Sequence, residues 1–127
     1  PAPRVLAELL DGGQSFRWQA EPATAAGAPT VWRGVWAGHH ARIRLRPTPE
    51  APAVLDFSAP PGADLAALGA ALTAYLAGPP ADVDALPWRS DPHLAACLRV
   101  FPGLRVLRQP FVEALLGFVC SATKQIV

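Results

Sequence analysis

The sequence predicts an α+β fold, in which a β-rich first half of the chain precedes a helical second half. Two observations lead to this prediction. Residues 1–57 contain short segments in which apolar and polar side chains alternate, as they do in half-buried strands. In the remainder, leucine and phenylalanine recur every three to four positions, which is the spacing of one face of a helix. The length of 127 residues, 51% of them hydrophobic, suits one ordinary domain, or one domain and part of a second.

Four strands are expected in the first half of the chain. The clearest covers residues 41–46, where apolar side chains alternate strictly with arginine. A second strand precedes it, and a turn with Gly38 joins the two as a hairpin, because glycine adopts a positive φ at little cost. The four expected strands are Gln14–Gln19, Val31–Trp36, Ala41–Arg46 and Val54–Phe57.

Three helices are expected in the second half, each with a recognisable first turn. Asp64 is a suitable N-cap for the first, Ser90-Asp91-Pro92 combines a cap with an early proline in the second, and Pro110 opens the third. Glycine and proline end the first two helices at 78–80 and 102–103. The apolar positions that define the helices are Leu65, Leu68, Leu72 and Leu76, then Leu94, Leu98 and Phe101, then Phe111, Leu115, Phe118 and Val119.

Composition excludes several classes of protein. No stretch approaches the roughly 20 apolar residues that span a bilayer, and the N-terminus lacks the pattern of a secretory signal, so we expect a cytoplasmic protein. Charge is nearly balanced, with 11 basic and 10 acidic residues, which gives the whole chain no strong electrostatic attraction for DNA or acidic membranes. Cys97 and Cys120 lack the spacing of a zinc site or a disulfide framework, and two buried thiols are expected.

The sequence contains no recognised catalytic set. Its three histidines are scattered, and Asp82 and Asp84 fit a solvated turn better than an acid–base pair. The arginine row formed by Arg42, Arg44 and Arg46 fits the solvent side of a strand, and a phosphate-contacting surface is the alternative.

Lys124 is the only lysine and therefore the only candidate amine nucleophile in the chain. It lies at an expected helix start, where free backbone N–H groups favour a phosphate. Ser121, Thr123 and Gln125 lie close to it in the sequence and complete a short polar cluster. This cluster fits either an ordinary turn between helices or a contact with nucleic acid.

Two stretches are hard to explain as ordinary structure. In Gly12-Gly13-Gln14-Ser15-Phe16-Arg17-Trp18, paired glycines precede aromatic residues, and glycine in such a place often lets another molecule approach the backbone. Together with residues 103–121 this stretch resembles the 8-oxoguanine DNA glycosylase family. Gly-Gln-Ser-Phe-Arg-Trp resembles the family's N-terminal signature, and 103–121 resembles the entry to its helix–hairpin–helix catalytic domain. Residues 32–35 and 88–91 fall where the family has similar residues.

The resemblance implies a fold. An N-terminal antiparallel twisted sheet with helices, similar to one half of the TATA-binding protein, precedes the first helices of an all-α helix–hairpin–helix domain. We expect residues 1–103 to form the first part and residues 104–127 to begin the second. The apolar helix near the end needs partners that so short a chain does not supply, so we expect the sequence to be the front part of a longer protein.

The resemblance also implies an activity. The family removes oxidised guanine from DNA by flipping the nucleotide into a pocket. A lysine amine attacks the sugar C1′ while an aspartate assists, and the resulting Schiff base can permit strand scission. The family's lysine and aspartate fall beyond residue 127, so we expect no catalytic residue, metal or cofactor here, and Lys124 is not assigned that role. The expected partner is double-stranded DNA containing a damaged base, bound by a monomer.

The resemblance assigns the reading of the base to the backbone carbonyl of Gly13. Guanine N7 accepts a hydrogen bond, whereas N7 of 8-oxoguanine carries a hydrogen and donates one. Residues 123–125 replace three asparagines usual in animals and fungi, which fits a bacterial branch with another opposite-base preference. The alternatives are a glycosylase for alkylated purines such as 3-methyladenine, and a non-catalytic DNA- or protein-binding module. The candidate site residues are Gly13, Phe118, Ser121 and Lys124 for the substrate, and Thr123 and Gln125 for DNA.

Overall fold

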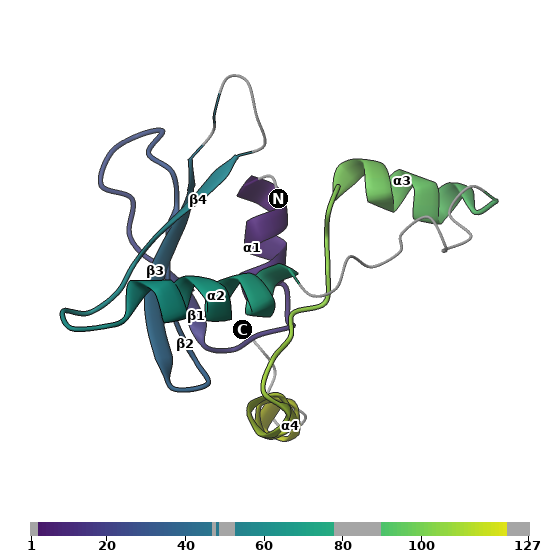
Figure 1. Cartoon of the computed structure of the whole chain (residues 1–127). Coiled ribbons are helices and arrows are strands. Elements are labelled where there is room, and N and C mark those ends of the chain that lie inside the picture. The colour runs from purple at the N-terminus through teal and green to yellow at the C-terminus, as the bar shows by residue number, and fades with distance from the viewer. Residues whose placement is uncertain (1–2, 47, 49–52, 78–89, 122–127) are drawn as a thin grey trace.

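The structure, a computed structural model of the chain, describes residues 3–46, 48, 53–77 and 90–121 (Figure 1). Two helices cover one face of an antiparallel sheet, and two more helices follow. The α+β fold predicted from the sequence is confirmed. In chain order the elements are α1 (Pro3–Asp11), β1 (Trp18–Ala20), β2 (Val31–Trp36), β3 (His39–Arg46), β4 (Val54–Ser58), α2 (Leu65–Ala77), α3 (Pro92–Val100) and α4 (Phe111–Ser121).

The four strands pair antiparallel in the order β1-β2-β3-β4. Trp18 of β1 lies opposite Gly34 of β2. Three of the expected strands are confirmed, although β3 begins at His39 rather than at Ala41. The turn with Gly38, whose φ is +76°, joins β2 to β3 as predicted.

The strand expected at Gln14–Gln19 is correct only in its last two residues, because β1 begins at Trp18. Residues 12–17 form a bent loop instead. The side chain and the main-chain carbonyl of Gln14 bond to residues 105–109 rather than to a neighbouring strand. As a result Phe16 is 47% exposed while Trp18 is buried.

Helix α1 is absent from our sequence prediction, which treated residues 1–57 as β-rich. Val5, Leu6, Leu9 and Leu10 of this helix are each at most 2% exposed and belong to the hydrophobic core. Their spacing is that of one helical face. The first half of the chain is therefore a helix followed by a sheet, and the prediction was incomplete because it omitted α1.

The core lies between the inner face of the sheet and helices α1 and α2 (Figure 1). Three tryptophans, Trp18, Trp32 and Trp36, are 4–6% exposed. The rings of Trp18 and Trp36 stack with centroids 5.5 Å apart, and the ring of Tyr75 from α2 lies 5.3 Å from that of Trp36. This aromatic cluster supports the region in which β1 meets the preceding loop.

The three expected helices are confirmed, and two have the expected caps. The carboxylates of Asp64 and Asp91 each accept hydrogen bonds of 2.9 and 3.0 Å from the backbone N–H groups of the second and third residues of the following helix. Helix α4 continues to Ser121, two residues beyond its expected end. The helix stop at 78–80 and the helix start at Lys124 lie outside the described residues.

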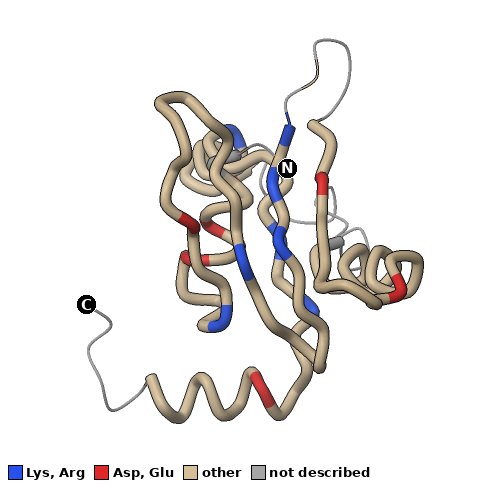
Figure 2. The backbone as a smooth tube through the Cα atoms, turned by 90° about the vertical axis from the view of Figure 1, so that its left-hand side faces the viewer, with Lys and Arg blue, Asp and Glu red and all other residues tan. Residues whose placement is uncertain are grey.

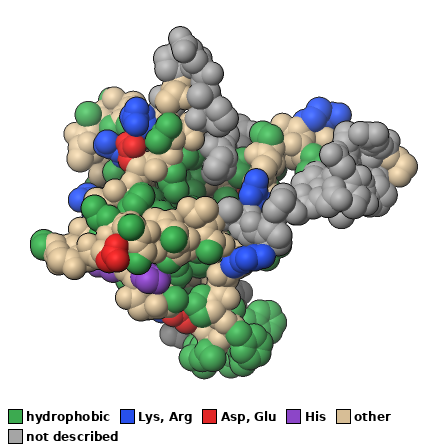
Figure 3. Space-filling model, viewed as in Figure 1, with side chains coloured by type: hydrophobic (Ala, Val, Ile, Leu, Met, Phe, Trp, Pro, Cys, Tyr) green, Lys and Arg blue, Asp and Glu red, His purple; other side chains and the backbone are tan. Residues whose placement is uncertain are grey.

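Helices α3 and α4 contain no buried residue among those described. The expectation of two buried thiols is therefore wrong, since Cys97 of α3 and Cys120 of α4 are exposed. Apolar side chains gather on the surface of α4 (Figure 3), where Phe111 and Phe118 are 77% and 70% exposed. None of the helices in the described part of the chain combines the length and apolar character needed to cross a bilayer.

Candidate functional site

The paired glycines open a loop of residues 12–17, here named the glycine loop. It begins where α1 ends, with the Gly12 N–H donating to the Glu8 carbonyl at 3.1 Å. Gly13 has a φ of +91°, which favours glycine. It is exposed, and a Cβ added to it meets no atom within 4 Å. Among the described residues no group donates a hydrogen bond to the Gly13 carbonyl, so its peptide is open to an approaching molecule.

Gln14 ties the glycine loop to residues 105–109, which precede α4. Its Nε2 donates to the Arg105 carbonyl at 3.0 Å, and its Oε1 accepts from the Leu107 N–H at 3.0 Å. The side-chain amide of Gln109 donates to the main-chain carbonyl of Gln14. Leu107 is 5% exposed and belongs to the core, so the segment is anchored. Gln14 therefore joins the two stretches that resemble the family's signatures.

Tyr75 of α2 supports the glycine loop from the core. Its hydroxyl accepts from Trp18 Nε1 at 3.2 Å and lies 3.3 Å from the hydroxyl of Ser15, which is 7% exposed. The carbonyl of Tyr75 accepts from the Arg108 N–H at 3.0 Å. Because buried polar groups need partners, this tyrosine links the loop, the sheet and the segment before α4.

Helix α4 packs against the glycine loop through one face. The Glu113 carboxylate forms an ion pair of 3.1 Å with Arg17 and accepts from the Ala37 N–H at 2.9 Å. One turn further, a Cβ added to Gly117 meets the ring of Phe16 at 2.8 Å. Glycine at this position thus permits the close approach of helix and loop.

A hollow of about 250 Å³ lies between the glycine loop, Tyr75 and α4. Ser15 and Phe16 line it from the loop, and Leu116 and Cys120 line it from the helix. Pockets that enclose a small ligand have volumes of about 300–1,000 Å³. The hollow that the described residues line beside the glycine loop therefore lies just below this range.

The structure describes only part of the predicted site. Gly13 lies on the loop, Phe118 is 70% exposed on α4, and Ser121 is half-buried, its hydroxyl donating to the Phe118 carbonyl at 2.8 Å. Ser121 lies one turn beyond Gly117, on the face toward the loop. Among the described residues no hydrogen bond joins Gly13 to this helix. The other predicted residues, Thr123, Lys124 and Gln125, together with the acidic pair Asp82 and Asp84, lie outside the described residues.

Sequence reasoning missed three residues that organise this region: Tyr75, Gln109 and Glu113. The signal for Glu113 was available, because it is the only charged residue of α4. Tyr75 likewise stands out as an aromatic hydroxyl in an otherwise small and aliphatic helix. Neither pattern says where the partner of the polar group lies in the chain.

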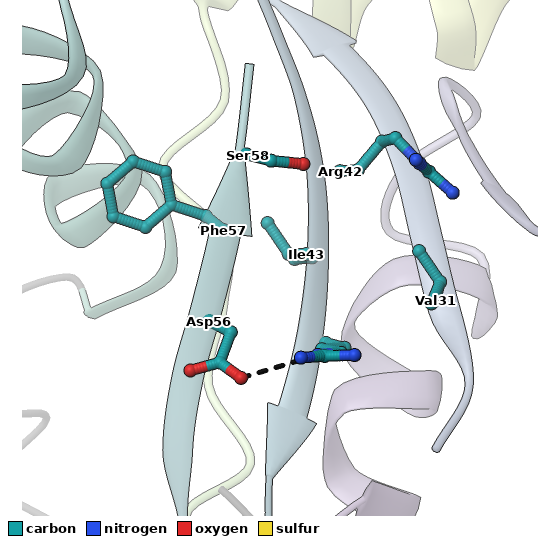
Figure 4. A pocket seen from close by; sticks show the side chains of 7 residues that line it. Val31, Arg42, Ile43, Asp56, Phe57 and Ser58 are labelled. Carbon is teal, nitrogen blue, oxygen red and sulfur yellow. Dashed lines mark hydrogen bonds and ion pairs between the residues drawn. The ribbon is translucent and has the colours of Figure 1, made fainter. Parts of the chain in front are cut away.

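The outer face of the sheet holds the predicted arginine row (Figure 2). Arg42 pairs with Glu21, and Arg44 and Arg46 pair with Asp56 at 3.3 and 3.2 Å. Figure 4 shows such a pair across β3 and β4, beside a hollow of about 200 Å³. Because carboxylates already bind these guanidinium groups, the solvent face of a strand is favoured over a phosphate-contacting surface.

Acidification is expected to weaken the sheet through these ion pairs. Hydrogen bonding from Arg42 holds the pKa of Glu21 below 4.5, and hydrogen bonding from Arg46 holds the pKa of Asp56 below 3.8. Such carboxylates add stability above their unfolded pKa and lose it as pH falls through the folded pKa. Urea denaturation from about pH 7 to about pH 3 will therefore show a smaller loss for the Glu21→Gln, Asp56→Asn double variant than for wild type. Equal losses contradict this prediction.

One of three comparisons with known proteins identifies a family. The family model of the 8-oxoguanine DNA glycosylase N-terminal domain matches residues 3–115. The matched range contains the glycine loop, the whole sheet and the first part of α4. A search of the curated proteins and a search of the solved structures each found no match. Since the matched range covers most of the chain, the protein belongs to the 8-oxoguanine DNA glycosylase family.

Proposed function

We propose that this chain forms the base-reading part of a glycosylase that removes 8-oxoguanine from double-stranded DNA by flipping the nucleotide out of the stack. A lysine that attacks the sugar C1′ and an aspartate that assists it come from outside these 127 residues. The Schiff base formed by that attack then permits strand scission. On this proposal residues 1–103 form the N-terminal domain, residues 104–127 begin the helix–hairpin–helix domain, and the chain alone is inactive.

The observation that carries the proposal is the open carbonyl of Gly13 on an anchored loop. A carbonyl oxygen attracts the N7–H of 8-oxoguanine and repels the N7 lone pair of guanine. No Cβ obstructs the approach, and the loop on which Gly13 lies is bonded to the core through Gln14 and Ser15. One such hydrogen bond contributes about 1–3 kcal/mol, or about 10- to 100-fold in affinity.

Further contacts are proposed around this carbonyl. Phe118 is exposed and Ser121 is half-buried on the helix that packs against the glycine loop, and this supports contacts to the flipped base. We assign Lys124 to the substrate as well, and Thr123 and Gln125 to the DNA strands. We also propose that the protein acts as a monomer in the bacterial cytoplasm, associated with the nucleoid.

The test uses the full-length protein that the gene encodes and a duplex with one 8-oxoguanine opposite cytosine. Excision is followed on a gel, and borohydride traps the Schiff base. Gly13→Ala is expected to slow excision by about 10- to 100-fold. Gly62→Ala is the matched control, because Gly62 also has a positive φ, +85°, and no atom within 4 Å of an added Cβ. It should leave excision within about twofold of wild type, because its backbone strain lies in the turn before α2 and not in the glycine loop.

The outcomes separate the possible activities. A trapped adduct that Gly13→Ala weakens and Gly62→Ala does not supports the proposal, and excision without an adduct removes the lysine attack and the strand scission that follows from it. Absence of both the adduct and excision overturns it. Excision from a parallel duplex with 3-methyladenine then assigns the protein to alkylated-base repair, and no excision from either duplex leaves a binding module.

A further inference from the structure

The direction of the Gly13 carbonyl is not set by Gly13 itself. The carbonyl lies in a rigid peptide plane shared with the backbone nitrogen of Gln14. Two dihedrals turn that plane, the ψ of Gly13 and the φ of Gln14, and glycine restricts its own dihedral less than any other residue. The adjoining residue must therefore hold the carbonyl in place.

Gln14 is held at three atoms. Its Nε2 and Oε1 bond to Arg105 and Leu107, and its main-chain carbonyl accepts from Gln109. On the other side, Gly12 bonds to α1. The peptide that joins Gly13 to Gln14 is therefore flanked by hydrogen-bonded residues on both sides, Gly12 and Gln14.

The segment that binds Gln14 is anchored in the hydrophobic core. Leu107 is 5% exposed, and the neighbouring Arg108 N–H bonds to the carbonyl of Tyr75. Tyr75 in turn is 3% exposed and contacts the tryptophan cluster. A displacement of the Gln14 side chain therefore changes the position of the glycine loop relative to the sheet.

We propose that Gln14 is a positioning residue that aims the Gly13 carbonyl, and that it thereby determines how well the protein distinguishes 8-oxoguanine from guanine. This inference rests on the proposed function, since it concerns the same carbonyl. A carbonyl that rotates freely attracts N7–H of the lesion less and repels N7 of guanine less. Loss of Gln14 therefore lowers discrimination rather than general affinity for DNA.

The main variant is Gln14→Leu in the full-length protein, which keeps the approximate size of the side chain and removes its hydrogen bonds. Gln109→Leu removes the donor to the Gln14 carbonyl and keeps the Gln14 side chain. Gln19→Leu is the matched control, because Gln19 is an exposed glutamine of β1 whose side chain accepts one long hydrogen bond of 3.4 Å from Arg33.

The readout is a discrimination ratio measured by fluorescence anisotropy: the dissociation constant for a duplex with guanine opposite cytosine, divided by the constant for a duplex with 8-oxoguanine opposite cytosine. A partly unfolded sample changes both constants equally and leaves their ratio unaltered. Gln14→Leu is expected to lower the ratio about tenfold and Gln109→Leu about threefold, while the constant for the guanine duplex changes little. Gln19→Leu should match wild type.

A double variant tests whether Gln14 acts through Gly13. If it does, Gly13→Ala lowers the ratio much less in the Gln14→Leu background than in wild type, because residues of one unit are non-additive. A role confined to stability predicts additive effects, and additivity overturns the inference.

The two proposals fail in different ways. A wild-type protein with equal constants for both duplexes refutes the proposed function. A wild-type protein that discriminates, beside a Gln14→Leu protein with an unchanged ratio, refutes only the role of Gln14. If Gln14→Leu does not fold, an unchanged ratio in Gln109→Leu refutes that role, and a lowered one supports it.

Discussion

Replacing Trp36 with alanine is expected to lower the free energy of unfolding by about 4 kcal/mol. The side chain is 4% exposed, and its ring contacts those of Trp18 and Tyr75 at centroid distances of 5.5 and 5.3 Å. Removing it leaves a cavity among rigid rings that cannot close around the gap, so the loss of transfer free energy and the cost of the cavity add. Urea denaturation measures the change directly.

Trp36→Phe serves as the comparison for this prediction. It keeps an aromatic ring against Trp18 and leaves a smaller cavity. The free energy of unfolding is therefore expected to fall by about 2 kcal/mol. A loss below about 1 kcal/mol for Trp36→Ala contradicts the assignment of Trp36 to the centre of the core. Because Tyr75 rests on this ring and bonds to Ser15, the alanine variant should also loosen the glycine loop.

Gly34→Ala is expected to destabilise the protein by about 3 kcal/mol, although it adds a single methyl group. Gly34 lies opposite Trp18 in the sheet, and an added Cβ lies 2.2 Å from the Trp18 ring. That ring is held by Trp36 and by a hydrogen bond to Tyr75, so it cannot move aside without disturbing the core. The same urea titration reports the loss.

Gly69→Ala in α2 is the matched control for Gly34→Ala. Its added Cβ meets only the tip of the Phe57 ring at 3.2 Å, and Phe57 is 36% exposed. Alanine is favoured over glycine in a helix by about 1 kcal/mol, so this variant should equal or exceed wild type in stability. If both glycine variants lose the same stability, the close contact with Trp18 is not the cause.

The sequence predicted those elements whose signals are local. The alternation in Ala41–Arg46 is enough to show which side chains of the strand face the core. Asp64 and Asp91 mark helix starts because an N-cap carboxylate bonds to backbone N–H groups only two and three residues later. Helix α1 also has a helical face in Val5, Leu6, Leu9 and Leu10, but it is only nine residues long and has no acidic residue in its first turn and no basic residue in its last, so its ends carry no charge signal.

The site was less predictable because its contacts join distant residues. The resemblance pointed to Gly13, and the family match confirmed that resemblance. Gln14 could equally begin a strand, and only its partners at 105–109 show why it does not. The prediction for Cys97 and Cys120 failed because it used only the general tendency of thiols to be buried. Both cysteines lie on helices whose described residues do not enter the core.

The strand order also has a consequence for the growing chain. Each strand pairs with the next along the chain, and short connections close with little loss of chain entropy, so these hairpins form readily during synthesis. The partners of Gln14 are 91 to 95 positions away. A nascent chain can therefore complete its sheet while the glycine loop is still unanchored, and the loop acquires its final shape only after residues 105–109 have left the ribosome.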